Sequence, residues 1–309
     1  YDLVVIGSGP AGQKAAIAGA KLGKRVAIIE REQREIGGAC LHTGTIPSKT
    51  MREAILHLTG FSQRNVYGDL YHKKHSITMP DLLRKLSQVT QREIDVINEH
   101  FDRNGIDVIE GEASFISPNE LSVVQADTSL VVRGEKIVVA CGTRPARPGH
   151  IPFDNRSVFD SDEILRLNRI PKNMIVVGAG VVGIEYAIMF AVLGVDVTVI
   201  ESRENLLEFC DREIVEMLQY ESRALGMMFR FGETVTNIER VNETNVAVAL
   251  KSGKRLAADT VLFSVGRQGD TERLNLEAAN IESDERGRIH CDENCQTSAS
   301  HIYAVGDIV

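Results

Sequence analysis

Two glycine triplets with the same spacing are the residues most able to do chemistry in this 309-residue chain. The first triplet is Gly7, Gly9 and Gly12, and the second is Gly178, Gly180 and Gly183. In this spacing the first glycine allows a tight turn, the second lets the backbone approach a pyrophosphate, and the third lets a helix pack closely on a strand. The pyrophosphate then lies at the positive N-terminal end of the helix. Each triplet therefore predicts a dinucleotide site.

The two triplets lie in two copies of one longer pattern. Residues 3–30 run from a hydrophobic strand through the first triplet and an alanine-rich helix to a second strand that ends in Glu30. Residues 175–201 repeat this order and end in Glu201. Such a pattern predicts a βαβ unit with a parallel sheet. Because the complete pattern occurs twice, chance turn glycines do not explain it.

The glutamates that end these units are expected to bind ribose. Glu30 and Glu201 should each accept a hydrogen bond from a 2′-hydroxyl. A carboxylate there repels a 2′-phosphate, so Glu201 favours NAD over NADP. Arg203 lies two residues further on and would reach a phosphate if its side chain turned inward; otherwise it is an ordinary surface arginine. The sequence thus predicts NAD and leaves NADP open.

The composition narrows the class of protein. The formal net charge is −8 and no basic block is present, which argues against nucleic acid as a partner. Five scattered cysteines suit a reducing cytoplasm better than a disulfide scaffold. The apolar stretch from Met174 to Val195 contains Glu185 and three glycines, so it predicts a strand, a turn and a buried helix instead of a membrane span.

The segments between and after the two units complete the predicted fold. Apolar residues from Leu83 to Phe101 recur at helical spacing, whereas residues 108–139 alternate in short runs typical of a β-meander. Three prolines between residues 145 and 152 mark a crossover. We therefore expect an α/β fold of two Rossmann-like, three-layer domains, each with a parallel sheet and a β-meander. Residues 150–269 would form one domain, inserted into a discontinuous domain of residues 1–149 and 270–309.

Several separated motifs resemble the two-dinucleotide flavoprotein family of glutathione reductase, dihydrolipoyl dehydrogenase and mercuric reductase. They are the two glycine patterns, Gly37-Gly38-Ala39-Cys40 with Ile46-Pro47-Ser48-Lys49, Cys141-Gly142-Thr143-Arg144-Pro145, Gly266-Arg267, and Tyr303–Asp307. The resemblance implies that the first unit binds FAD and that the second binds NAD(H) or NADP(H) as substrate. The C-terminal dimerisation domain usual in that family is not found here, which suggests a truncated chain and a homo-oligomer when full length.

The resemblance also implies which residues form the sites. The FAD set is Gly7, Gly9, Gly12, Glu30, Cys40, Thr45, Lys49, Ala113, Gly142 and Asp307. The NAD(P) set is Gly178, Gly180, Val182, Gly183, Glu185, Glu201, Arg203, Gly266 and Arg267. Lys49 is expected near flavin N5 in a pair with Glu185, and these two are the predicted catalytic residues. Their plainer interpretations are a solvated lysine at a helix start and an ordinary ion pair.

One departure from the family pattern limits the chemistry. Disulfide reductases of the family carry two cysteines, with four residues between them, just before the Ile-Pro-Ser-Lys stretch. Here Cys40 holds the first position and Thr45 holds the second. Threonine forms neither a disulfide nor a charge-transfer thiolate. Electrons would therefore not leave the flavin through a dithiol.

The branch of the family that resembles the chain at this point is the soluble, Si-specific pyridine nucleotide transhydrogenases. This resemblance implies hydride transfer between NADPH/NADP and NAD/NADH through FAD N5, without a redox-active disulfide. Two alternatives stay open. One is a dihydrolipoyl-dehydrogenase-like oxidoreductase with a non-dithiol acceptor, and the other is a non-catalytic nucleotide-binding or redox-sensing module. Cys291 and Cys295 have no second Cys/His pair at metal-ligand spacing, so no metal site is predicted.

Overall fold

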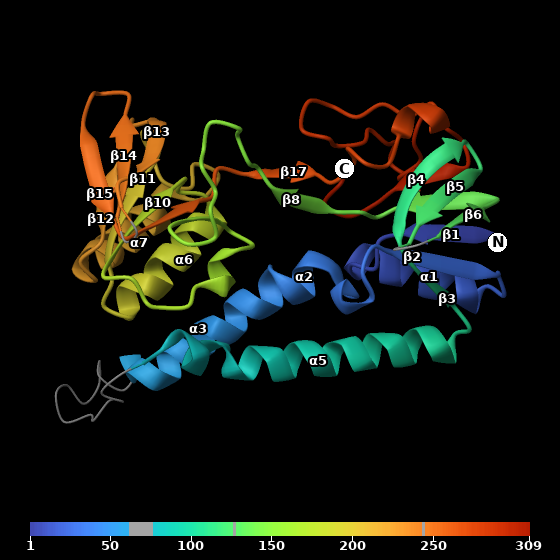
Figure 1. Ribbon diagram of the computed structural model, residues 1–309, viewed down its shortest axis with the longest axis horizontal. Helices are drawn as coiled ribbons and strands as arrows, with labels where there is room; N and C mark the ends of the chain where they lie inside the picture. Colours follow the sequence, from blue (N-terminus) through green and yellow to red (C-terminus); the bar gives the residue numbers. More distant parts are fainter. Residues whose placement is uncertain (62–76, 126–127, 243–244) are drawn as a thin grey trace. The chain divides into compact units, whose positions relative to one another are not determined.

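The chain folds into two compact units, which are described separately. A computed structural model describes residues 1–61, 77–125, 128–242 and 245–309. The first unit comprises Tyr1–Pro47, Gln88–Arg144 and Arg267–Val309, and the second comprises Ser48–Ser87 and Pro145–Gly266 (Figure 1). The sequence assigned residues 48–87 to the first domain, whereas their contacts group them with the second unit. The domain assignment itself stays a prediction.

The first unit is built on a five-stranded parallel sheet with the strand order β18-β7-β1-β2-β3. Its strands are β1 (Leu3–Ile6), β2 (Val26–Glu30), β3 (Asp107–Glu110), β7 (Lys136–Val139) and β18 (Ile302–Ala304). The chain adds β2 and β3 on one side of β1, and β7 and β18 on the other. The carboxyl end of β1 is therefore a topological switch point, where parallel α/β sheets bind ligands.

Each face of this sheet is covered by a different layer. Val4 and Ile6 pack with the meander of β4 (Glu112–Ser117), β5 (Glu120–Val124) and β6 (Ser129–Arg133). Val5 points to the opposite face, as alternation along a strand requires, and packs with helices. These helices are α1 (Pro10–Lys21), α2 (Gly38–His42) and the C-terminal part of α5 (Met79–Arg103). The unit is thus a three-layer sandwich of meander, parallel sheet and helices.

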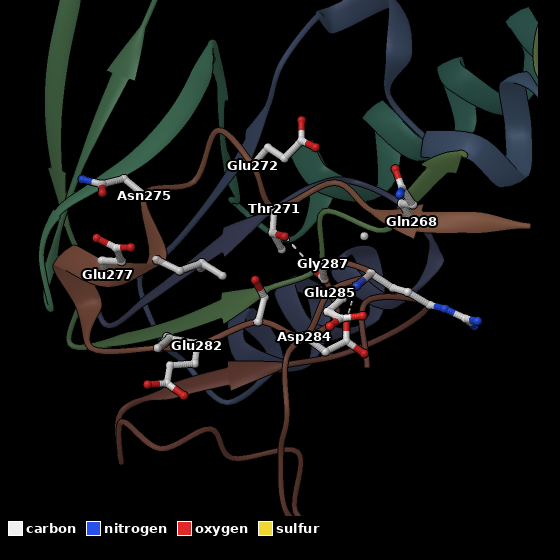
Figure 2. Close-up of a pocket in the computed structure, with 14 residues that line it drawn as sticks. Gln268, Thr271, Glu272, Asn275, Glu277, Glu282, Asp284, Glu285 and Gly287 are labelled. Atoms are coloured by element: carbon white, nitrogen blue, oxygen red, sulfur yellow. Dashed lines mark hydrogen bonds between the residues drawn. The ribbon is translucent and has the colours of Figure 1, made fainter. Parts of the chain in front are cut away.

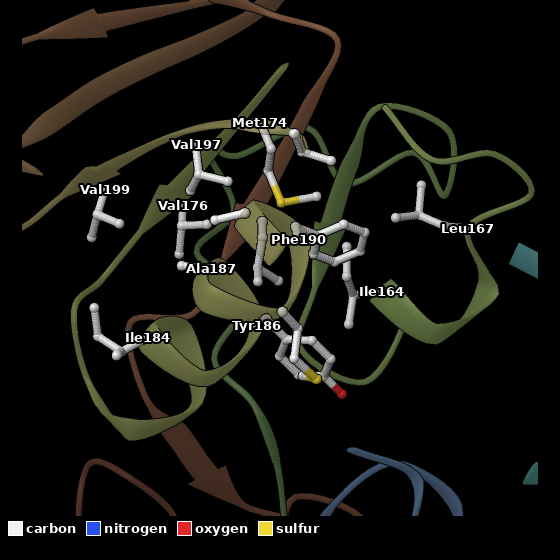
Figure 3. Packing of buried hydrophobic residues seen from close by; sticks show 14 of the residues in the cluster. Ile164, Leu167, Met174, Val176, Ile184, Tyr186, Ala187, Phe190, Val197 and Val199 are labelled. Atoms are coloured by element: carbon white, nitrogen blue, oxygen red, sulfur yellow. The ribbon is translucent and has the colours of Figure 1, made fainter. Parts of the chain in front are cut away.

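The second unit repeats this plan. Its parallel sheet has the order β12-β11-β10-β16-β9, with β10 at the switch point. The strands are β9 (Val158–Asp160), β10 (Asn173–Val177), β11 (Asp196–Ile200), β12 (Met228–Arg230) and β16 (Thr260–Phe263). A meander covers one face and consists of β13 (Val235–Arg240), β14 (Val246–Leu250) and β15 (Arg255–Ala258). The other face packs against α6 (Val181–Val192) (Figure 3). Helices α7 (Arg212–Ala224) and α3 (Thr45–Thr59) contribute to the same apolar cluster.

A few short elements complete the fold. β8 (Thr143–Pro145) and β17 (Arg267–Gly269) form a two-stranded ribbon. Single 3-10 turns occur at Gln33–Glu35, Ile164–Arg166 and Leu276–Ala279. No helix in the described ranges is long and apolar enough to cross a lipid bilayer.

Most predicted elements are confirmed, and one is corrected. Both βαβ units, the fold class and the helix over residues 83–101 are present. The meander is shorter than expected because only β4, β5 and β6 form it, while β3 and β7 join the parallel sheet. Strand periodicity identifies a strand but not its partner, so the sequence could not separate these two cases.

The apolar cluster around α6 predicts a large cost for truncating Phe190. Its side chain is fully buried, and Figure 3 shows it beside Met174 and Ile164. Phe190→Ala should lower the free energy of unfolding by about 3–5 kcal/mol through the cavity it leaves. Phe209 is 73% exposed, so Phe209→Ala should change that free energy by less than about 0.5 kcal/mol. Urea unfolding of the two variants would measure both; equal losses would contradict the packing described.

Candidate dinucleotide-binding sites

The first glycine loop joins β1 to α1 through contacts that only glycine permits. Gly7 has a φ of +97°, and its N–H donates to the Ile29 carbonyl at 2.8 Å. A Cβ at Gly7 would lie 2.5 Å from the Ala140 carbonyl oxygen, and one at Gly12 would lie 1.9 Å from the Gly7 carbonyl oxygen. Both separations are below van der Waals contact. The absent side chains therefore let α1 pack directly on the end of β1.

The second loop has the same geometry. Gly178 also has a φ of +97°, and its N–H donates to the Ile200 carbonyl at 2.8 Å. A Cβ at Gly178 would lie 2.5 Å from the Ser264 carbonyl oxygen, and one at Gly183 would lie 2.1 Å from the Gly178 carbonyl oxygen. The repeat seen in the sequence is thus a repeat of backbone geometry.

The middle glycine of each loop serves a different purpose. Gly9 and Gly180 are the N-caps of α1 and α6 and have φ values of −62° and −72°, which any residue can adopt. A Cβ on either would meet nothing within 4 Å. The open space lies before the unpaired N–H groups of a helix start, where anions bind. Each loop is therefore a cradle that fits a pyrophosphate.

The two predicted ribose carboxylates lie beside these cradles. The buried Glu30 Oε2 accepts hydrogen bonds from Ser8 N at 2.9 Å and Ser8 Oγ at 2.6 Å. In the second unit, Glu201 Oε2 accepts from Ala179 N at 2.7 Å. The hydrogen-bonded pairs are 22 residues apart in both copies. Each carboxylate is held to its own glycine loop and keeps acceptor capacity for a ribose hydroxyl.

The Glu201 carboxylate is stabilised in its ionised form. Burial opposes ionisation, but hydrogen bonds from the backbone N–H groups of Arg203 and Ala179 and from the Ser202 hydroxyl outweigh it. Together with the nearby Arg203 charge they hold the pKa of Glu201 below its ordinary value. Glu201 is therefore an anion at neutral pH, with a guanidinium close by.

Two further segments of the first unit meet at its glycine loop. A Cβ at Gly38, the start of α2, would lie 3.0 Å from the Gly9 Cα. A Cβ at Gly306, after β18, would lie 3.0 Å from the Ala11 Cβ. Gly306 has a φ of +80° and precedes the exposed Asp307. Asp307 is thereby placed near the start of α1.

Ser8 is a site residue that the sequence did not identify. Besides binding Glu30, its Oγ accepts a hydrogen bond from Gly37 N at 3.1 Å. This single hydroxyl connects the glycine loop, the ribose carboxylate and the turn before α2. The second copy has Ala179 at this place, which carries no hydroxyl, so a comparison of the two loops would have drawn attention to Ser8.

Cys40 and Thr45 lie on consecutive helices of the chain. Cys40 is a free, partly exposed thiol within α2, and Thr45 is the first residue of α3. His42 Nε2 lies 2.9 Å from the Ile36 carbonyl oxygen, which anchors the end of α2. The position that would carry a second redox cysteine therefore carries a hydroxyl at a helix start.

Lys49 and Glu185 form an ion pair within the second unit. Lys49 extends from α3 and Glu185 from α6, and the Lys49 Nζ contacts the Glu185 Oε1. Their side chains are 49% and 41% exposed. A pair this open to solvent contributes about 0–1 kcal/mol to stability. Its contribution to the stability of the fold is therefore too small to explain why the ion pair is present.

The remaining predicted residues are distributed between the units. Ala113 is buried on β4, and Gly142 follows β7 with a φ of +68°. Val182 is 40% exposed in the first turn of α6, and Gly266 follows β16 with a φ of +127°. Arg267 lies on β17 in the first unit and donates to Thr143. The structure thus brings together the glycines and glutamates of each unit, and it places Arg267 beside Thr143 of the first unit.

A cavity elsewhere in the first unit does not suit a dinucleotide. It has a volume of about 610 Å³ and is lined by residues 268–287 (Figure 2). Its acidic lining residues are Glu272, Glu277, Glu282, Asp284 and Glu285. So many carboxylates repel a pyrophosphate. The glycine loops remain the better sites.

Two glycine cradles on Rossmann-like units define the fold class of a protein with two dinucleotide-binding folds. Comparison with known proteins agrees. The chain matches the pyridine nucleotide-disulphide oxidoreductase family over residues 1–309 and belongs to that family.

Similar proteins include transhydrogenases and a disulfide reductase. The soluble pyridine nucleotide transhydrogenase of Mycobacterium bovis is 52% identical over 311 aligned positions, and that of Colwellia psychrerythraea is 41% identical over 310. Both alignments cover 100% of this chain and 66% of the relative. The HOCl-induced flavoprotein disulfide reductase RclA of Escherichia coli, solved as a Cu(II) complex, has a TM-score of 0.87 and 31% identity. That match also covers 100% of this chain and 66% of the neighbour. The chain thus spans slightly less than two thirds of the length of these relatives.

The different roles of the middle and last glycines of the α6 loop predict different defects. Gly183→Ala should lower the free energy of unfolding by about 1–3 kcal/mol, because its methyl group overlaps the Gly178 carbonyl. Gly180→Ala should fold normally but bind NADH about 10- to 100-fold more weakly, because its methyl group fills the cradle. Urea unfolding and fluorescence titration with NADH would separate the two. Unchanged NADH affinity in Gly180→Ala would show that the cradle is not the site.

Proposed function

We propose that the protein is an FAD-dependent oxidoreductase that transfers hydride between NADP(H) and NAD(H) without a redox-active disulfide. The observation that carries this proposal is the pair of dinucleotide cradles together with Thr45 in place of the second cysteine. The similarity to transhydrogenases at 41–52% identity supports it. When bound, FAD would accept and return a hydride at N5.

The first unit is proposed to hold FAD and the second the nicotinamide nucleotide. The α1 start would hold the FAD pyrophosphate, and Glu30 its adenosine ribose. Asp307 reaches the same loop and is an acceptor for the hydroxyls of the flavin side chain. Ala113, Gly142, Cys40 and Thr45 complete the proposed set.

In the second unit the same division of roles applies to the substrate nucleotide. The α6 start would hold the pyrophosphate, with Val182 beside it as an apolar contact. Glu201 would bind the 2′-hydroxyl of NAD, and the adjacent Arg203 would offset its charge when a 2′-phosphate binds. Gly266 and Arg267 belong to the proposed nucleotide set through the family resemblance.

Lys49 is proposed to place a positive charge at the flavin, with Glu185 keeping that lysine oriented. A fixed cation favours extra electron density on the group beside it. The ion pair is too exposed to be explained by stability, which supports a role in the site.

We further propose a cytoplasmic location and a homo-oligomer for the whole protein. The free state of all five cysteines is compatible with a reducing compartment.

Turnover between two nucleotides tests the proposed function directly. With FAD bound, the protein should reduce a thionicotinamide analogue of NAD⁺ at the expense of NADPH, because neither half-reaction needs a dithiol. Absorbance of the reduced analogue is the measurement, and omission of NADPH is the control. Reduction of the bound flavin by NADPH without any reduced analogue would refute the transhydrogenase and favour another acceptor.

Replacing Lys49 should impair hydride transfer and leave the fold intact. Lys49→Met should lower kcat on the order of 10²-fold, the loss usual when a preorganised charge is removed from a reacting group. The Tm should stay within about 3 °C because the pair is half exposed. The exposed Lys251 of the same unit gives the matched control Lys251→Met. Full activity in Lys49→Met would remove Lys49 from the site.

A further inference from the structure

Two cysteines of the first unit lie at a tight turn that is not part of its glycine loop. The turn closes between Asp292 and Gln296, where Asp292 N donates to the Gln296 carbonyl at 2.9 Å. Cys295 N donates to the Asp292 carbonyl at 3.0 Å, and the Asp292 carboxylate accepts from Gln296 N at 2.8 Å. These bonds hold Cys291, just before the turn, near Cys295 within it.

The turn places the two thiols near each other. Both residues are partly exposed and not in a disulfide. Burial, the Cys295 thiol and the Asp292 carboxylate raise the pKa of Cys291, which therefore stays protonated near neutral pH. A dithiol is thus present in a position that a small reagent can reach.

The other cysteines differ in their surroundings. Burial, followed by the charge of Asp270, raises the pKa of Cys141 to about 12, so this thiol is inert. Cys210 is exposed in the second unit, and Cys40 lies in α2. The turn between Asp292 and Gln296 brings Cys291 and Cys295 together, whereas the other three cysteines lie on other segments of the chain.

We propose that Cys291 and Cys295 form a redox-active dithiol that low-molecular-weight disulfides convert to an intramolecular disulfide. This modification site is separate from the Cys40–Thr45 position and does not depend on the proposed hydride transfer. In this proposal a disulfide forms at a turn of the first unit, and it does not exchange electrons with the flavin.

The reaction is a double thiol–disulfide exchange with oxidised glutathione as the oxidant. The Cys295 thiolate attacks one glutathione sulfur, so a mixed disulfide forms and one glutathione thiolate leaves. Cys291 then loses its proton and attacks the Cys295 sulfur, which releases the second glutathione thiolate. The two cysteines lose two protons and two electrons, and the two glutathione thiolates take up the two protons. The protein is oxidised and the glutathione disulfide is reduced.

The position of the pair suits a reversible modification. The ring that the disulfide closes is short, so it restricts the unfolded chain little and is not needed as a structural cross-link. The turn also pairs with β18, since Ala304 N donates to the Cys295 carbonyl at 2.9 Å and Gln296 bridges to Tyr303. Three residues later the same strand end reaches Asp307. Oxidation is therefore linked to the segment that approaches the first glycine loop.

Peptide mass spectrometry of the whole protein tests the proposal. The protein is incubated with oxidised glutathione, quenched in acid, alkylated under denaturing conditions and digested with trypsin. No Lys or Arg lies between Ile289 and Val309, so one peptide beginning after Arg288 carries both cysteines and none of the other three. We expect this peptide to lose two hydrogens, to gain no label and no glutathione, and to recover both labels after reduction. Persistent glutathione adducts, or two alkylated cysteines after oxidation, would overturn the proposal.

Three cysteine variants test which two thiols form the disulfide. Cys295→Ser and Cys291→Ser should each accumulate one glutathione adduct at the remaining cysteine, because the second exchange has no thiol. Cys210→Ser is the matched control and should form the disulfide at the unchanged rate. A cross-link between this peptide and the Cys210 peptide in the wild type, absent in Cys210→Ser, would show that the oxidised partner is Cys210 and would overturn the proposal. The wild-type measurement decides the proposal even if a cysteine variant folds poorly.

Discussion

The site geometry depends on one close approach, that of a helix to the strand before it. In both units the third glycine of the loop lies against the carbonyl oxygen of the first, closer than any side chain would allow. This contact directs the helix start toward the carboxyl edge of the sheet and brings the glycine loop within hydrogen-bonding reach of a glutamate on the next strand. Pyrophosphate binding, ribose binding and the order of the sheet therefore share one steric requirement.

That requirement explains why the geometry of the two loops could be predicted from the sequence. A backbone position that tolerates no Cβ must be glycine, and the carboxylate needed at the neighbouring strand end must come from Glu or Asp. Both requirements restrict the residue type at a fixed spacing, so they can be recognised in the sequence. The parallel strands around each loop could also be predicted, because they are short runs of apolar residues. Residues such as Gly7, Gly183 and Glu201 could be assigned without a structure for this reason.

Contacts between side chains distant in sequence could not be predicted in this way. The Ser8 hydroxyl accepts a hydrogen bond from Gly37 N, and no local pattern in the residues between them predicts that the chain returns to Ser8. Arg147 binds the buried Asp160 and Glu163, and its guanidinium also stacks on Phe153. These groups fix the crossover into the second unit, yet each appears in the sequence as an ordinary charged or aromatic residue. The same limit applies to β3 and β7, whose partners depend on tertiary packing.

The positions of the cysteines determine which redox chemistry the protein can carry out. At the position after α2 a threonine replaces the residue that would take electrons from a flavin, whereas Cys291 and Cys295 form a dithiol in a separate turn. An account in which hydride passes only between nucleotides requires that the flavin has no dithiol partner. The Lys49–Glu185 pair fits this account because it supplies charge without exchanging electrons.

Anaerobic reductive titration of the flavin-loaded protein tests this central claim most directly. The account predicts that one equivalent of NADPH bleaches the flavin completely and that no long-wavelength thiolate–flavin band appears. Growth of that band with the first equivalent, followed by uptake of a second equivalent before the flavin bleaches, would contradict it, since a dithiol would then share electrons with the flavin.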